Sequence, residues 1–349
     1  MKTKSLRITV TMIVLLVISC DEPETIVTNY VHPDGSVTRK IEMRFVKNEF
    51  NPKDYQVPFD TSWRVKDSIE ISEKGDTTWV KKAEKTFPDA ASITSAYKND
   101  TAVNSGFDRS VYFEKHFRWF NTEYRFAEKV GKIMQHGYPV SDYLSGDELQ
   151  WFYSPQELRD KQMNSADSLK YKHFSDTIDK KTEKWMVESV FSEWIAGFSN
   201  LTAGKGSENV IGDLKSREKE LSEMILERYM EKWDSLWEHG IILNDLIGKD
   251  NAEKFRTEAD SSMGIAIKEL MPDFRDYKVS TVMPGRLTGT NGFSDSTGVL
   301  LWPVTSDLFL TQDYEMWAES KTSNTWAWVI SAVFIGFVLT GLAIRIKKG

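Results

Sequence analysis

Cys20 is the only cysteine in the 349-residue chain, and its thiol is the side chain best placed for covalent chemistry. A thiol reacts as the thiolate and must be accessible to do so. Cys20 follows an apolar stretch, residues 8–19, which is itself preceded by three basic residues. A basic segment, a short apolar segment and a small residue at the cleavage point are typical of a secretory signal peptide. We therefore predict that residues 1–19 are a signal peptide and that Cys20 follows the cleavage point.

The sequence Val17-Ile18-Ser19-Cys20 resembles the lipobox of bacterial lipoproteins. This resemblance implies that the thiol of Cys20 is acylated and that Cys20 becomes the lipidated N-terminus of the mature chain. The alternative is a buried free cysteine inside an uncleaved anchor. With one cysteine the chain forms no disulfide within itself, so the exported part must be stabilised by an apolar core.

A second anchor is predicted near the C-terminus. Residues 326–344 contain no charged side chain, and the tail 345–349 is basic. At about 1.5 Å per residue the apolar segment forms a helix about 28 Å long, close to the hydrocarbon thickness of a bilayer. Basic residues mark the cytoplasmic side of a span, and tryptophans such as Trp317, Trp326 and Trp328 are typical of its interfacial belt. We predict a transmembrane helix over 326–344, with a cytoplasmic tail and an extracytoplasmic main domain.

The two anchors also predict a location. Helical spans are typical of the inner membrane, because bacterial outer membranes are spanned by closed β-barrels. Asp21, directly after the lipidated position, resembles the inner-membrane retention signal of some proteobacterial lipoproteins. We expect a lipid-anchored, single-pass protein of the bacterial inner (plasma) membrane.

The exported part of the chain is acidic. Three basic residues lie in the signal and three in the tail, so residues 20–325 keep 39 of the 45 basic residues against all 52 acids, a balance of −13. Phosphate-rich polymers repel such a surface. We therefore expect no nucleic-acid partner; the predicted partners are the lipid bilayer and another membrane or envelope protein.

No catalytic, cofactor or metal site is predicted. The five histidines are scattered, without the clustering that a zinc site needs. The segment 197–206 lacks the spacing and the final Ser or Thr of a phosphate-binding loop. Two acid pairs could serve acid/base chemistry, Asp147 with Glu148 and Glu188 with Glu193, but acids on charged helices more commonly cap helices or face solvent. The chain is therefore interpreted as non-enzymatic.

Residues 20–138 are predicted to be mostly β. Apolar and polar residues alternate over Val37–Phe45, and Arg39 is the one charged residue on the apolar face. The turn signal Asp34-Gly35 predicts a hairpin over residues 25–45. A second hairpin is predicted around Lys74-Gly75-Asp76, and the aromatic density of Ser110–Phe126 indicates a further strand.

Residues 139–271 are predicted to form a helical insertion. Ser145 with Glu148 fits a capping box, and Ser154 with Pro155 and Glu157 fits the start of another helix. The apolar pattern of Glu183–Leu201 predicts one amphipathic helix, and that of residues 212–238 predicts a long second one. The aromatic residues of these helices suit core packing, although a lipid or glycan pocket is an alternative.

Strand patterns return over residues 272–322, where "DYEMWAES" is the last candidate strand. The order strand, helix, strand predicts an α+β fold. We expect one antiparallel sheet built from the N- and C-terminal segments, an inserted helical layer and the C-terminal transmembrane helix.

The segment "MPGRLTGTNGFSDSTGVLLW" resembles a Pro-Gly, Asn-Gly and tryptophan pattern of LppM-like bacterial lipoproteins, which combine a lipobox, an exported α/β domain and a C-terminal transmembrane helix. The matching positions are Pro284 and Gly285, Asn291 and Gly292 at a turn, and Trp302 at the end of the next strand. The glycines and Asn291 suit positive φ in tight turns. The resemblance implies structural roles and no catalytic set.

Three functions are ranked from these features. The first is a membrane-anchored, non-enzymatic envelope protein that binds a partner or acts in an envelope assembly. The second is a lipid or hydrophobic-ligand binder at the membrane surface, indicated by an aromatic content of 12%. The third is an envelope hydrolase that uses a carboxylate pair.

Overall fold

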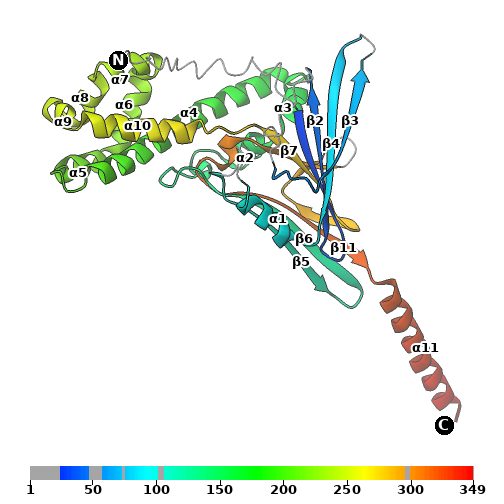
Figure 1. Ribbon diagram of the computed structural model, residues 1–349. Coiled ribbons are helices and arrows are strands. Elements are labelled where there is room, and N and C mark those ends of the chain that lie inside the picture. The colour runs from blue at the N-terminus through cyan, green and yellow to red at the C-terminus, as the bar shows by residue number, and fades with distance from the viewer. Residues whose placement is uncertain (1–23, 47–56, 73–74, 101–105, 295–298, 349) are drawn as a thin grey trace.

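The computed structural model describes residues 24–46, 57–72, 75–100, 106–294 and 299–348. Two β-sheets stand at an angle to each other, a helical unit extends to one side, and the helix α11 (Thr325–Lys348) projects from the opposite end (Figure 1). The predicted α+β class is confirmed, since N- and C-terminal strands share both sheets and most helices lie between them in sequence. The predicted signal peptide, Cys20 and Asp21 lie outside the described residues.

The larger sheet has seven strands in the order β3-β4-β2-β1-β7-β10-β9. Their bounds are β1 (Glu24–Val31), β2 (Val37–Phe45), β3 (Arg64–Ile71), β4 (Thr77–Phe87), β7 (Tyr277–Val282), β9 (Phe293–Ser294) and β10 (Leu300–Val304). Both predicted hairpins are present, β1 with β2 and β3 with β4. Gly35 adopts φ +95° in the first turn, as the Asp-Gly signal predicts.

One pairing in this sheet differs from the antiparallel arrangement predicted. β1 and β7 are parallel, with Val27 opposite Val279. Parallel neighbours need a long connection. The whole helical unit lies in that connection, which brings together two strands about 250 residues apart in sequence.

The second sheet has four strands in the order β5-β6-β11-β8. They are β5 (Arg109–Phe117), β6 (Asn121–Val130), β8 (Arg286–Thr290) and β11 (Tyr314–Ser323). The aromatic segment predicted as one strand is thus a hairpin of two, and "DYEMWAES" is confirmed as part of β11. β11 pairs with β6 from Tyr314 opposite Val130 to Ser323 opposite Asn121.

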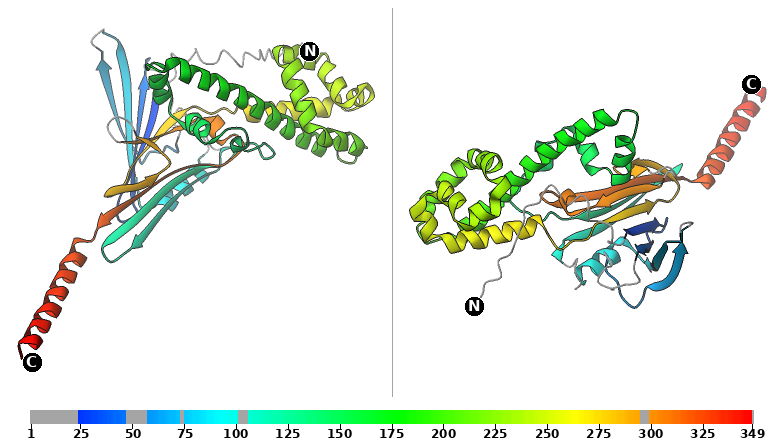
Figure 2. Two further views of the ribbon diagram at one scale, coloured as in Figure 1. Left: turned by 180° about the vertical axis from the view of Figure 1, so that it is seen from behind. Right: turned by 90° about the horizontal axis from the view of Figure 1, so that it is seen from above.

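The main apolar core lies between the sheets, with α1 (Ala90–Lys98) packed against β5 and with α2 (Gly146–Tyr153) and part of α4 (Ser168–Thr202) contributing to it. Among its fully buried side chains are Trp185 and Trp302. A second apolar cluster holds the helical unit together, around Trp194, Phe198 and Phe255. Figure 2 shows this unit standing away from the sheets.

The helices α2 and α3 begin at or near the residues predicted from the sequence. The capping box is confirmed at the start of α2, where the Ser145 N–H donates to Glu148 Oε2 at 2.7 Å. The cap predicted at Ser154 is wrong, because this residue ends α2 and its hydroxyl donates to the Trp151 carbonyl at 2.7 Å. Pro155 takes the cap position of α3 (Gln156–Met163), and Glu157 binds Lys278 of β7.

The single helix predicted over residues 212–238 is wrong. The chain bends at Arg217 and Tyr229, so that Leu214 and Leu221 both reach the core of the helical unit from different helices. The helices of this unit after α4 are α5 (Glu208–Ser216), α6 (Glu218–Arg228), α7 (Trp233–Glu238), α8 (Ile241–Ile247), α9 (Lys249–Lys254) and α10 (Arg256–Leu270). Packing between helices has overridden the local amphipathic pattern.

Candidate functional site

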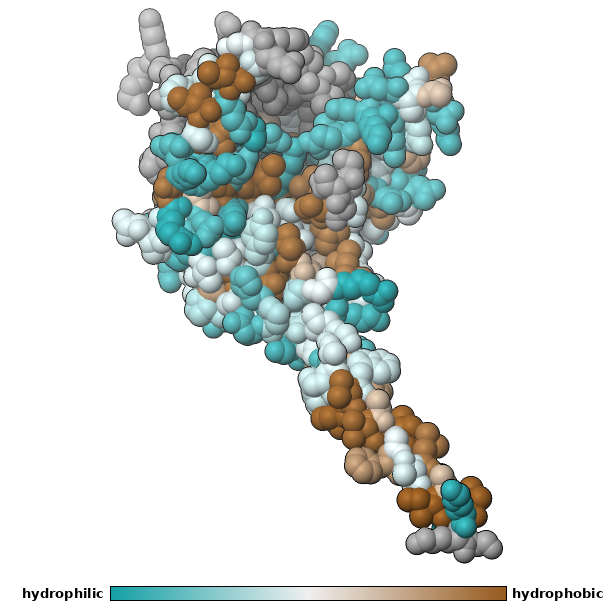
Figure 3. Space-filling view, turned by 90° about the vertical axis from the view of Figure 1, so that its right-hand side faces the viewer, coloured by the Kyte–Doolittle hydropathy of each residue, from teal (hydrophilic) through white to brown (hydrophobic). Residues whose placement is uncertain are grey.

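The most distinctive surface of the protein is α11. Within Thr325–Lys347, the most apolar stretch of 18 residues has a mean hydropathy of 2.3, and only 6% of this stretch is buried against the rest of the protein. The segment is long and apolar enough to cross a membrane, judged by length and composition. Figure 3 shows α11 as a largely apolar rod below a mixed surface.

Asn324 is the only residue between β11 and α11. Its Nδ2 donates to the Arg118 carbonyl at 2.7 Å, and its backbone N–H donates to the Phe120 carbonyl at 2.9 Å. Thr122 Oγ1 donates to Asn324 Oδ1 at 3.0 Å. These bonds fasten the start of α11 to the turn of the β5–β6 hairpin.

Trp317, which was predicted with Trp326 and Trp328 to lie at the membrane interface, does not lie next to α11. Trp317 lies in β11, eight residues before the first residue of α11, which corresponds to about 25 Å of extended chain. Its ring packs against the guanidinium of Arg125 at 4.9 Å. Trp326 and Trp328 do lie at the start of α11, as predicted.

The segment 283–302 carries the residues predicted from the family resemblance, and the structure gives most of them structural contacts. Pro284 and Gly285 form the turn between β7 and β8, where Gly285 has φ +77°. A Cβ at Gly285 would lie 2.4 Å from the Lys321 carbonyl oxygen. Glycine is therefore required both by the backbone conformation and by the close approach of β11.

Asn291 and Trp302 contact each other directly. Trp302 Nε1 donates to Asn291 Oδ1 at 3.0 Å, the Trp317 N–H donates to the same oxygen at 2.9 Å, and Asn291 Nδ2 donates to the Glu315 carbonyl at 2.6 Å. The positive φ predicted for Asn291 and Gly292 is wrong. Gly292 is needed because a Cβ there would lie 2.6 Å from the Trp302 ring, and Trp302 lies in the middle of β10 rather than at its end.

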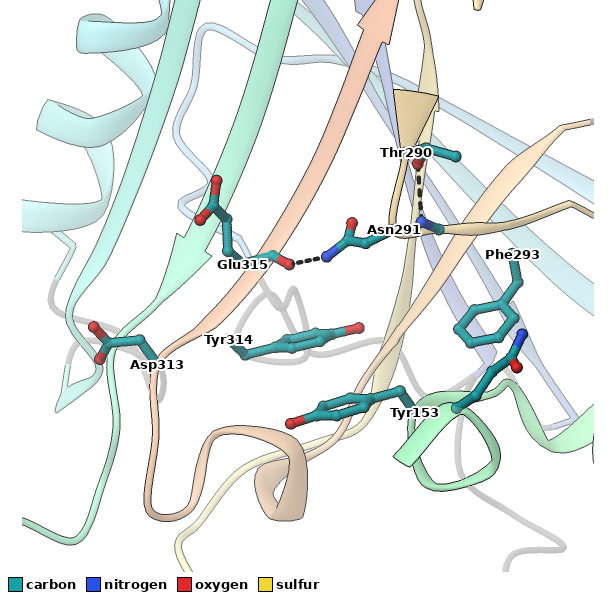
Figure 4. Close-up of a pocket in the computed structure, with 9 residues that line it drawn as sticks. Tyr153, Thr290, Asn291, Phe293, Asp313, Tyr314 and Glu315 are labelled. Carbon is teal, nitrogen blue, oxygen red and sulfur yellow. Dashed lines mark hydrogen bonds between the residues drawn. The ribbon is translucent and has the colours of Figure 1, made fainter. Parts of the chain in front are cut away.

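An open cavity of about 460 Å³ lies beside Asn291 (Figure 4). Tyr153 of α2 and Tyr314 of β11 stack in it, with ring centroids 5.8 Å apart. A groove of about 770 Å³ adjoins it along α2, α3 and α4, and Gln150 and Phe293 line both. The walls mix aromatic rings with amides, hydroxyls and carboxylates, which suits a ligand with both apolar faces and hydrogen-bonding groups.

The two acids of the cavity are held in ion pairs. Asp313 Oδ2 lies 2.5 Å from Lys129 Nζ, and this contact lowers the pKa of Asp313. Glu315 Oε1 lies 3.1 Å from Arg125 Nη2. A general acid at neutral pH needs a raised pKa, so Asp313 is not suited to that role.

The acid pairs considered from the sequence are also separated into different contacts. Glu148 binds Lys181 at 2.6 Å in addition to its capping bond. Glu188 accepts a hydrogen bond from Tyr143, whereas Glu193 Oε1 lies 3.0 Å from His136 Nδ1. Within the described ranges, no group of three or more His, Cys, Asp or Glu side chains could hold a metal ion.

A buried polar network joins the two sheets and was not predicted. Arg39 Nη2 of β2 lies 2.7 Å from Glu128 Oε2 of β6, and Arg39 Nε donates to Asn29 Oδ1 at 2.8 Å. Tyr97 of α1 donates to Glu128 Oε1 at 2.8 Å, and burial raises the pKa of Tyr97. The signal was the single charged residue, Arg39, on an otherwise apolar strand face.

A second buried arginine extends this network. Arg109 Nη1 donates to the Tyr277 hydroxyl at 2.5 Å, and the guanidinium lies 5.0 Å from the Tyr97 ring centroid. Arg109 is only 2% exposed. Since these groups are enclosed between the sheets, we assign the network to holding the sheets together rather than to binding a ligand.

Comparison with known proteins gives little further information. No protein-family model and no curated protein matches the sequence. The folded domain of LppM from Mycobacterium tuberculosis, solved by NMR, aligns over 87% of this chain and 92% of its own length with 10% sequence identity and a TM-score of 0.26. Similarity at this level is weak and does not place the chain in that family.

Proposed function

We propose that the protein is a membrane-anchored, extracytoplasmic and non-enzymatic lipoprotein that binds another protein of the bacterial envelope. α11 would cross the inner membrane and the acylated Cys20 would provide a second anchor. The short junction at Asn324 supports this proposal. It holds the sheets close to the start of α11, whereas the helical unit lies at the far end of the molecule (Figure 1). With α11 in the membrane, the sheets would lie near the membrane surface and the helical unit farther from it.

The observation that favours protein binding is the exposed strand β3. In the described part of the chain it forms one of the two edges of the seven-stranded sheet, and β9 forms the other. Val65, Ile69 and Ile71 share one face of it and are 49%, 52% and 72% exposed. Proteins usually protect such edges, because an exposed apolar edge strand pairs readily with another chain.

The occupant that fits this edge is an extended strand of the partner protein. Added next to β3, it would receive main-chain hydrogen bonds from the edge and place alternate apolar side chains beside Val65, Ile69 and Ile71. The opposite face of β3 is already engaged, as Arg64 pairs with Glu84 and Glu70 pairs with Arg44. The first face also carries Asp67, which pairs with Lys81 at 2.9 Å. Specificity would therefore come from the exposed apolar side chains on either side of Asp67.

The test is photocrosslinking in intact cells with p-benzoylphenylalanine placed at Ile71. A matched control carries the same group at Leu169, which is 84% exposed on α4. A discrete crosslinked protein at position 71, absent at 169 and lost when Ile69→Lys is added, supports the proposal. Equal crosslinking at both sites, or none at position 71, contradicts it.

A second candidate function is binding of a hydrophobic or amphipathic ligand near the membrane. The groove lined by Trp151, Tyr171 and Phe174 favours it, since aromatic walls are common in ligand sites. Native mass spectrometry of the detergent-purified full chain would reveal a bound lipid as a discrete mass increment. Loss of that increment in a Phe174→Lys variant would locate the ligand in the groove.

A further inference from the structure

Five aromatic side chains gather where the β5–β6 turn meets α11, and we call them the aromatic collar. They are Phe117, Trp119 and Phe120 of the hairpin and Trp326 and Trp328 of the helix. Trp119 lies 5.3 Å and Phe117 lies 6.2 Å from Trp326, and Phe120 lies 4.3 Å from Trp328, measured between ring centroids. Figures 1 and 2 show the hairpin tip beside the start of α11 from two sides.

The collar is exposed. Its members are between 38% exposed, for Phe120, and 58% exposed, for Phe117. With roughly 100 Å² of ring surface open on each side chain, the collar presents on the order of 500 Å² of apolar surface, which is large for a protein face that meets only water.

The turn also reaches along the helix. Trp119 Nε1 donates to Ser331 Oγ at 2.9 Å. Ser331 is six residues beyond Thr325, which corresponds to about 9 Å along α11. The indole of Trp119 therefore reaches the second turn of the helix, while the backbone of the hairpin turn lies beside Asn324 at the start of the helix.

Asn324 satisfies the backbone carbonyl groups of the turn. The carbonyl groups of Arg118 and Trp119 accept from Asn324 Nδ2 at 2.7 and 3.3 Å, and that of Phe120 accepts from the Asn324 N–H at 2.9 Å. The Arg118 N–H donates to the Asn121 carbonyl at 2.8 Å. In the hydrocarbon core of a bilayer, backbone polar groups need partners within the protein, and these carbonyls have them.

We infer that the β5–β6 turn inserts into the bilayer beside α11, with the collar at the boundary between phospholipid headgroups and acyl chains. Tryptophan is the residue type most suited to this boundary, because its ring is apolar and its N–H is polar. Arg118, whose side chain is 65% exposed, lies with its Nε 3.3 Å from Glu123 Oε2, and an exposed arginine in this position can present its guanidinium to the headgroups. This inference rests on the proposed membrane span of α11 and adds a second point of contact.

The test uses the full chain in proteoliposomes of phosphatidylcholine brominated near the top of the acyl chains, which quench nearby tryptophans. Trp119→Phe is compared with two matched variants that also remove one indole. Trp328→Phe removes a tryptophan of α11 itself, and Trp317→Phe removes one in β11 that precedes the helix by about 25 Å of extended chain. We expect Trp119→Phe and Trp328→Phe each to lower the lipid-quenchable emission by about one third, as one of three interfacial tryptophans, and Trp317→Phe to leave it unchanged.

The outcomes distinguish the membrane span of α11 from the insertion of the β5–β6 turn. A loss with Trp328→Phe but none with Trp119→Phe would overturn the insertion of the turn and leave the span of α11 intact. No loss with either variant would overturn the span and the insertion together. The difference in quenchable emission between the parent chain and Trp119→Phe is also measured at higher protein density in the vesicles. If this difference disappears, a second protein and not lipid covers the collar, and the inference is overturned.

Discussion

Arg39 of β2 and Glu128 of β6 form an ion pair of 2.7 Å in which each side chain is only 1% exposed. The pair joins the two sheets across the core, and Asn29 and Tyr97 supply further hydrogen bonds to it. Such a pair is not a large source of stability by itself, because its desolvation offsets its attraction. Its importance lies in the cost of breaking it.

Glu128→Ala should lower the free energy of unfolding by about 3 to 5 kcal/mol, because it leaves Arg39 charged and buried without its partner. The double variant Arg39→Leu with Glu128→Ala should recover part of this loss, since it removes the buried charge as well. Urea unfolding of the detergent-solubilised chain measures both. A Glu128→Ala loss of less than about 1 kcal/mol would contradict the assigned role.

Gly285→Ala should lower the free energy of unfolding by about 2 to 4 kcal/mol, because alanine is strained at φ +77° and its Cβ would meet the Lys321 carbonyl. Gly212→Ala is the matched control. Gly212 lies in α5 with no atom near its Cβ position, so alanine should raise stability there by up to about 1 kcal/mol. Equal effects of the two substitutions in thermal unfolding would count against this assignment.

Asn291→Ala should lower the free energy of unfolding by about 1 to 2 kcal/mol. The reason is that the indole N–H of Trp302 and the backbone N–H of Trp317 lose the oxygen that accepts both hydrogen bonds. Asn291→Asp keeps that acceptor and loses only the bond to the Glu315 carbonyl. We therefore expect the aspartate variant to be the more stable of the two in urea unfolding. The reverse order would mean that the amide donor matters more than the oxygen.

Asp60 should contribute a small acid-sensitive stabilisation. Its hydrogen bond to Lys85, at 2.8 Å, lowers the pKa of Asp60 to about 2, compared with about 3.9 in an unfolded chain. The folded state favours the ionised form, so this stabilisation is complete above about pH 4 and is lost as the pH falls toward 2. Because the side chain is 60% exposed, its size is at most about 1 kcal/mol.

The measurement for Asp60 is a comparison of the parent chain with Asp60→Asn. The difference in their free energies of unfolding should be largest near pH 5 and should shrink at pH 2 to 3. A difference that stays constant over this range would show that ionisation of Asp60 is not involved.

Local signals predicted much of the fold. The Asp34-Gly35 turn, the alternation in β2 and the capping box at Ser145 depend on residues close in sequence, and each is present in the structure. The apolar helix near the C-terminus was also predicted, because a long uncharged segment has few alternatives.

Features that depend on distant residues were not predictable. The parallel pair β1–β7 joins segments separated by the whole helical unit, and the pattern within each strand does not indicate its neighbour. Arg39 stood out on its strand face, but nothing local identified Glu128, 89 residues away, as its partner. Likewise, the role of Trp119 beside Ser331 arises only when a hairpin tip meets a helix more than 200 residues later.

The one-residue junction at Asn324 has a mechanical consequence. With so short a hinge, and with its side chain fixed to the hairpin, a change in the tilt of α11 would rotate the attached body as a lever. α4, with 35 residues, is about 52 Å long, so a rotation of the body by about 10° would displace one end of α4 by about 9 Å relative to the other. In the proposed membrane-anchored state, tilting is one response of a helix to a thinner bilayer, and a tilt of α11 would move the helical unit relative to the membrane surface.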